Sequence, residues 1–161
     1  MYTRDYIMRM IEQLTQVLVR VLFQKELKDY PKALDEIHAG ATRMLGIDWP
    51  LFVRLGDEAM IDLLSRRAEM DRRVYAVAAD LLKAESEILR LQGNEDEAWM
   101  RMVSAFSLYC ETLKENGSDE VRAKALRALD EIDGYELPPH AEEKRRWLVG
   151  ASGDGAAGPN A

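Results

Sequence analysis

Apolar residues recur at intervals of three and four along almost the whole chain, and this spacing limits the fold more than any other feature. Such intervals place side chains on one face of an α-helix, whereas a half-buried strand would alternate at every second residue. In the first segment the pattern runs over residues 3–27, and polar side chains fill the opposite face. Thr3 is a suitable N-cap because its hydroxyl can accept an amide hydrogen bond. The sequence therefore predicts a long amphipathic first helix.

Turn residues divide the rest of the sequence into further helical segments. Pro31 suits the first turn of a helix, where its missing N–H is not needed, and Gly46, Gly93 and Gly117 each end a periodic run. We expect further helices over residues 31–45, 48–55, 68–92, 94–115, 118–133 and 141–148, and one more that begins at residue 57. The fold class is therefore all-α, an antiparallel helix bundle in one domain over residues 1–149. Residues 150–161, which contain four glycines and little to bury, are expected to be disordered.

Two of the predicted helix pairs share a pattern of small and large residues. Ala98 is followed by Met102 and Ala105, and Ala33 is followed by Ile37 and Gly40. A small side chain lets two antiparallel helices approach closely, and a large one fills the groove between them. Before the second pair, Leu82, Ser86 and Leu89 provide the facing positions.

This pattern resembles the tetratricopeptide repeat, which implies helical hairpins that pack side by side. The alanines at 33 and 98 are 65 residues apart, whereas two full repeats require about 68, so we expect an irregular insert over residues 46–67 rather than a regular array. The opening run Tyr2-x-x-Asp5-Tyr6-Ile7-Met8-Arg9-Met10, with Tyr30-x-x-Ala33-Leu34, also resembles a group of short, uncharacterised helical bacterial proteins. That resemblance implies a fold but no activity.

The charge of the chain is acidic and unevenly distributed. There are 22 Lys and Arg against 29 Asp and Glu, a net charge of −7. Residues 1–80 carry a net −1 and residues 81–161 a net −6. General nucleic-acid binding is therefore not expected, because it needs a basic surface, and a charged partner of the second half should itself be basic. No apolar run is long enough for a membrane span.

The start of the sequence shows no leader pattern, and a single cysteine cannot form an internal disulfide. We therefore expect a cytoplasmic protein.

Side chains that could carry chemistry are few and scattered. His38 and His140 are about a hundred residues apart, and neither has a second ligand at helical spacing, so a metal site is not expected. Cys110 shares a helical face with Val103 and Phe106, which is typical of a core cysteine. The sequence also lacks the glycine-rich phosphate-binding motifs. We predict no catalytic, cofactor-binding or metal-binding residues, and no cofactor.

Apolar residues outside the core faces suggest two functions. Met8, Val19 and Phe23 lie outside the main apolar face of the first helix, which favours a protein–protein interaction module that forms a homodimer. The alternative is a small-molecule or peptide-binding domain with a groove between helices, whose walls would include Tyr75, Trp99 and Tyr109.

Overall fold

The protein is all-α, as the sequence predicts. The computed structural model describes residues 4–68, 73–115 and 117–156. The described residues are 85% helical and contain eight helices and no strand. The helices are α1 (Arg4–Glu26), α2 (Tyr30–Leu45), α3 (Trp49–Phe52), α4 (Asp57–Ala68), α5 (Arg73–Leu91), α6 (Glu95–Glu115), α7 (Asp119–Ile132) and α8 (Pro139–Ala156).

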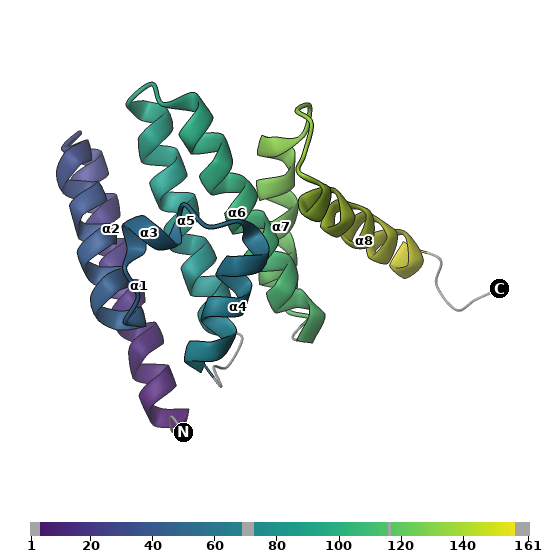
Figure 1. The fold of residues 1–161 in the computed structure, drawn as a ribbon, viewed down its shortest axis with the longest axis horizontal. Coiled ribbons are helices and arrows are strands. Elements are labelled where there is room, and N and C mark those ends of the chain that lie inside the picture. The colour runs from purple at the N-terminus through teal and green to yellow at the C-terminus, as the bar shows by residue number, and fades with distance from the viewer. Residues whose placement is uncertain (1–3, 69–72, 116, 157–161) are drawn as a thin grey trace.

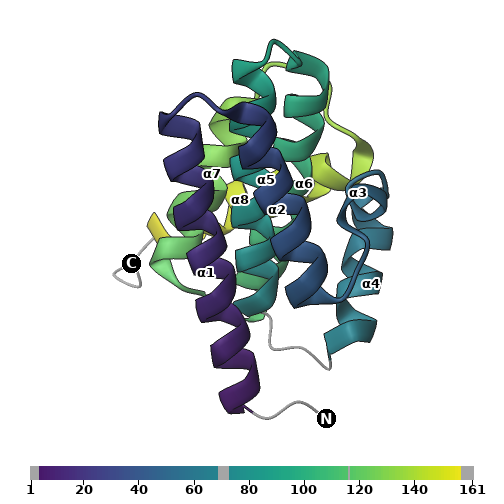
Figure 2. The same cartoon turned by 90° about the vertical axis from the view of Figure 1, so that its left-hand side faces the viewer.

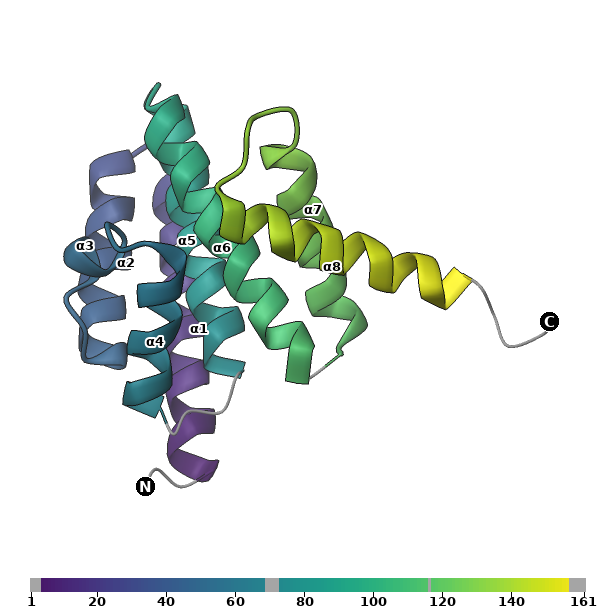
Figure 3. The same cartoon turned by 45° about the vertical axis from the view of Figure 1, so that its right-hand side comes forward.

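The hairpin of α1 and α2, the hairpin of α5 and α6, and then α7 follow one another across the molecule, and the two helices of each hairpin run antiparallel (Figure 1). At one end, α1 and α2 run antiparallel and are joined by a short turn (Figure 2). The central pair is α5 and α6, and α7 packs on the other side of α6. The last helix, α8, crosses α6 and α7 obliquely (Figure 3). Helix α1 contacts both α2 and α5, so the two hairpins share one core.

Local sequence explains where α2 begins and ends. The Asp29 side chain accepts a hydrogen bond of 3.3 Å from the backbone N–H of Lys32, and Pro31 occupies the first turn. At the other end Gly46 has a φ of 65°, and its N–H donates to the carbonyl of Thr42. A left-handed residue closes a helix in this way at least cost when it is glycine.

Small residues lie at the closest approach in both helix pairs. In α2, a Cβ atom added at Gly40 would be 2.6 Å from Cγ2 of Val17 in α1. In the central pair, the Ser86 hydroxyl of α5 donates a hydrogen bond of 2.5 Å to the carbonyl of Ala98 in α6. Both contacts agree with the small residues that the sequence places at these positions, and both bring the two backbones together.

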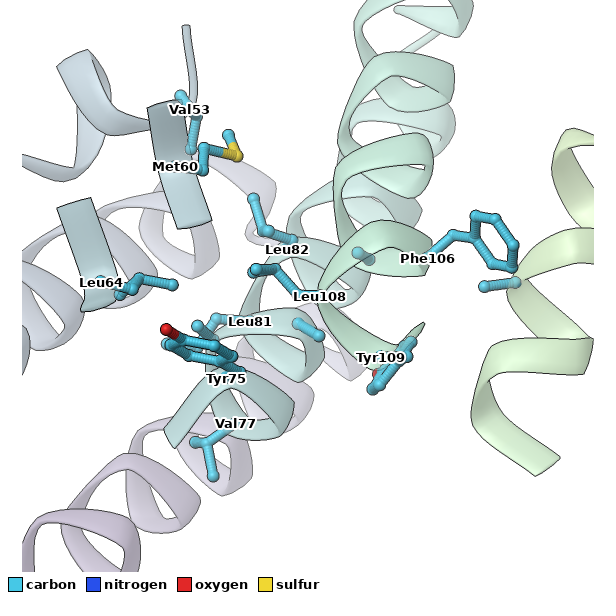
Figure 4. Packing of buried hydrophobic residues seen from close by; sticks show 14 of the residues in the cluster. Val53, Met60, Leu64, Tyr75, Val77, Leu81, Leu82, Phe106, Leu108 and Tyr109 are labelled. Atoms are coloured by element: carbon cyan, nitrogen blue, oxygen red, sulfur yellow. The ribbon is translucent and has the colours of Figure 1, made fainter. Parts of the chain in front are cut away.

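The segment between the two hairpins contains α3 and α4, and its large side chains belong to the core. Trp49 and Phe52 are buried, with ring centroids 5.2 Å apart. Met60 and Leu64 of α4 are also buried and join the apolar cluster of α5 and α6 (Figure 4). The expected insert is thus a packed part of the domain.

Several helix boundaries differ from the sequence-based expectation, and the largest differences are at the start of α5 and the end of α8. Ala68 was expected to begin the long central helix, but it is the last residue of α4, and α5 begins at Arg73. Helix α8 begins at Pro139 and continues to Ala156, beyond both the expected end of the last helix at 148 and the expected start of the tail at 150. Glycines lower helix propensity but do not prevent a helix that has already begun. Thr3 and residues 157–161 lie outside the described residues.

Candidate functional site

A cavity lies where the ends of α5, α6 and α7 meet. Its volume is about 610 Å³, within the range of small-molecule sites. Its walls come from the last turn of α5, the first two turns of α6, the last turn of α7 and the segment after α7. The lining residues are Arg90, Glu95, Asp96, Trp99, Met100, Glu131, Tyr135 and Glu136.

Two aromatic side chains form the apolar part of this cavity. The rings of Trp99 and Tyr135 meet edge to face, with centroids 5.9 Å apart and planes inclined by 66°. Tyr135 is 70% exposed, and Met100 beside it is also exposed. The indole Nε1 of Trp99 is buried, and no hydrogen-bond partner for it is found in the described part of the chain.

The charged side chains of the cavity are mostly acidic. Its one arginine, Arg90, lies 3.9 Å from Glu95 and 3.5 Å from Glu131. Asp96 and Glu136 have no ion pair with any other described residue. Four carboxylates thus face a single guanidinium, and that guanidinium is shared between two of them.

A second cavity of about 310 Å³ lies on the other side of Trp99 and Met100. It is lined by residues of α4, α6 and the start of α8, among them Val103, Ser104 and His140. Trp99 and Met100 therefore separate two hollows in the surface.

The three aromatic residues expected to line one groove are not brought together. Trp99 lines the cavity, but Tyr75 and Tyr109 are buried in the core (Figure 4). The Tyr109 hydroxyl donates a hydrogen bond of 2.5 Å to Asp80, and Lys124 lies 3.1 Å from the same carboxylate. Burial, and then the Asp80 charge, raise the pKa of Tyr109 above its ordinary value. These contacts of Tyr109 join α5, α6 and α7, and the burial of both tyrosines keeps them from forming the wall of an open groove.

A buried carboxylate joins four helices at Glu85, which sequence reasoning did not single out. His38 Nε2 lies 2.8 Å from one oxygen of Glu85, and Trp49 donates its indole N–H to the other at 3.3 Å. Arg101 Nε lies 3.3 Å from that second oxygen. The one sign of this buried carboxylate in the sequence is that a glutamate stands on an otherwise apolar helix face, between Leu82 and Leu89. Its partners come from α2, α3 and α6, which no local pattern could reveal.

The two histidines and the cysteine that the sequence analysis considered lie in separate places in the described structure. None of their His, Cys, Asp and Glu side chains form a group of three that could hold a metal ion. His140 lies 2.6 Å from the Lys144 amine, and His38 is engaged with Glu85. Burial raises the pKa of the Cys110 thiol to about 12, despite the opposing charges of Lys144 and Lys114, so the unreactive thiol form dominates at neutral pH.

Helix α1 lies at the side of the molecule that faces the viewer in Figure 2, and an apolar stripe follows the exposed side of its second half and the residue after its end. It comprises Val19, Leu22, Phe23 and Leu27, each more than half exposed, and we call it the α1 stripe. Two of the three residues expected at an interface, Val19 and Phe23, belong to it. Met8 lies nearer the start of the helix, where its sulfur is 3.2 Å from Nη1 of Arg73.

Comparison with known protein families matches residues 1–126 to DUF6483, a family of unknown function. The chain belongs to this family. No curated protein and no solved structure matches the chain. The DUF6483 match covers α1 to α6 and the first half of α7, and it includes the α1 stripe, Glu85 and Trp99. Glu131, Tyr135 and Glu136, which close the large cavity, follow the matched range. None of the described helices of this DUF6483 chain is both long and apolar enough to cross a membrane.

Proposed function

We propose that this protein is a non-catalytic helical interaction module that self-associates through the α1 stripe. The observation that carries the proposal is the exposure of Val19, Leu22 and Phe23 on α1 and of Leu27 directly after it. Exposed apolar side chains that occur singly are ordinary, but four on adjacent turns form a contiguous patch of the kind found at interaction sites.

A second copy of the chain is the partner that this geometry fits best. The stripe has the three- and four-residue spacing by which helices pack side by side, and a two-fold axis would place the same stripe opposite it. Fully burying one such side chain contributes roughly 1.5–3 kcal/mol, and association costs at least about 4 kcal/mol. Because these side chains are already partly buried in one chain, we expect a weak dimer with a dissociation constant in the micromolar range.

Sedimentation velocity over a concentration series tests this proposal. Phe23→Glu places a charge at the centre of the stripe and should shift the protein to monomer at every concentration. Leu51→Glu is the matched control, because Leu51 of α3 is equally exposed but lies outside the stripe. A wild-type protein that stays monomeric at millimolar concentration, or a Phe23→Glu variant that associates as the wild type does, would refute self-association.

Several finer expectations belong to the same proposal. The close contact of Ser86 with Ala98 supports a tetratricopeptide-like plan for the central helix pair. The acidic second half of the chain supports a basic protein as any further charged partner. The single, buried cysteine is compatible with a cytoplasmic location.

The second candidate function is the binding of a small molecule or peptide at the cavity of Trp99. The specific observation that favours it is a cavity of about 610 Å³ with an aromatic wall. Its test is a panel of neutral, anionic and cationic small molecules, read from the indole N–H signal of Trp99 in nitrogen–proton correlation spectra. Trp99→Phe assigns that signal among the three indoles. If no compound in the panel shifts the signal, the cavity is not a binding site.

A further inference from the structure

We propose that the cavity at Trp99 binds an organic ammonium group. This inference rests on the second candidate function and adds the chemical class of the ligand. The group could come from a free polyamine or from a lysine side chain of a basic peptide, and the experiment below separates these sources.

The charge of the cavity is the first reason. Four carboxylates line it, and the single guanidinium of Arg90 is already paired with Glu95 and Glu131. Asp96 and Glu136 are left to face a ligand. Opposite charges a few ångströms apart attract and like charges repel, so a cation is favoured in this cavity and an anion is disfavoured.

The helix ends at the cavity add to this preference. The carbonyl ends of α5 and α7 reach it at Arg90 and Glu131, and the C-terminus of a helix carries a partial negative charge. Glu131, in the last turn of α7, adds its charge to this negative end, and Arg90, which Glu131 shares with Glu95, offsets only part of it. The amide end of α6 would favour an anion, but Glu95, Asp96 and Glu97 already occupy its first turn.

The aromatic wall distinguishes an organic cation from a metal ion. An ammonium group over the face of a Trp or Tyr ring gains about 0.5–2 kcal/mol, and its carbon chain can pack on Met100. A divalent metal ion would instead need several ligands converging on one point. No group of three suitable side chains is found among the described residues, so the cavity carboxylates are too dispersed for a metal.

Titration of the full chain with spermidine at low ionic strength tests the inference. We expect a saturable shift of the Trp99 indole signal, with smaller changes for Trp49 and Trp147. Tyr135→Leu should weaken binding by roughly 2- to 30-fold, and Tyr135→Phe should leave it within about twofold, because phenylalanine keeps the ring face. Tyr135 is well suited to this comparison because its exposure makes both variants compatible with folding.

A charge-removal pair tests the electrostatic part. Asp96→Asn removes one cavity carboxylate and should weaken spermidine binding about 2- to 5-fold. Asp35→Asn is the matched control, because it removes an exposed carboxylate of α2 that does not line the cavity. Equal effects of the two variants would show a response to overall charge only and would overturn the inference.

Three further titrations complete the design. The first titration uses the tripeptide acetyl-Gly-Lys-Gly-amide. If the tripeptide binds more tightly than spermidine, the ammonium group comes from a peptide lysine, and if spermidine binds more tightly, it comes from a free polyamine. Magnesium chloride should not produce the shift, and an equal shift with Mg²⁺ overturns the inference. If neutral compounds bind while both amines fail, the ligand class is wrong and the second candidate function survives. If no probe binds, both are wrong.

Discussion

Replacing Gly40 with alanine should destabilise the protein, although the same change usually stabilises a helix. An alanine in a helix interior is favoured over glycine by about 1 kcal/mol. At Gly40, however, the new Cβ would lie 2.6 Å from Cγ2 and 2.8 Å from Cγ1 of Val17. Ordinary contact between carbon atoms is about 3.5–4.0 Å.

The size of the effect follows from the surroundings of Val17. This side chain is fully buried, and because both of its methyl groups overlap the new atom, rotation about χ1 cannot clear the contact. Helices α1 and α2 must therefore separate slightly. Overpacking of this kind costs roughly 1–3 kcal/mol, and the double overlap favours the upper part of that range. After the gain in helix propensity, we expect a net loss of about 1–2 kcal/mol.

Urea denaturation followed by circular dichroism measures this loss, and thermal denaturation should show a decrease of roughly 2–8 °C in Tm. Gly150→Ala in α8 is the matched control, because a Cβ there meets no atom within 4 Å and only the propensity gain of about 0.5–1 kcal/mol should appear. In a Val17→Ala background, Gly40→Ala should become neutral or stabilising. If Gly40→Ala alone is as stable as the wild type, the close contact between α1 and α2 is not as described.

Two further changes test the buried polar groups. Glu85→Ala should lower the free energy of unfolding by about 3–5 kcal/mol, because it leaves the nearly buried Arg101 without its counter-ion. The control is Glu87→Ala, which removes a partly exposed ion pair two residues along α5 and should cost less than about 1 kcal/mol. Similar losses in the two variants would contradict the assignment of Glu85 as a buried anchor. Burial raises the pKa of the Cys110 thiol from 9.0 to about 12. As the pH rises, this thiol therefore ionises first in the unfolded chain, so the free energy of unfolding should fall between about pH 9 and 12. Urea denaturation at pH 8 and pH 10 should show this fall in the wild type and a smaller one in Cys110→Ala, and equal falls would exclude a contribution from the thiol.

Much of the fold could be predicted because helix formation leaves local signals. The spacing of apolar residues gave the helical class, and Pro31, Gly46, Gly93 and Gly117 marked boundaries within a few residues of those observed. The small residues at the closest helix contacts were also readable, since their spacing within each helix is regular. At the other boundaries the local pattern was ambiguous. Ala68 fits either of two neighbouring helices, and the glycines after 149 weaken a helix without stopping it.

The candidate site was less predictable because its residues are far apart in the sequence. Trp99 was identified as a possible wall of a groove, but its companions Tyr75 and Tyr109 turned out to be core residues. All three are large aromatic side chains on helices, and only the rotation of each helix in the packed domain sets which of them faces outward. Tyr135, which does meet Trp99, follows the end of α7 and carries no helical pattern of its own.

The amino-acid sequence thus specified an acidic helical domain, the approximate limits of its helices and the excess apolar surface of the first helix, because each depends on neighbouring residues. The tertiary packing decided which side chains meet. It brought Glu85 to His38, Trp49 and Arg101, and it assembled one cavity from the ends of three helices. Glu85 is 16, 36 and 47 positions from Arg101, Trp49 and His38, and the geometry of these contacts is set by how whole helices pack against one another.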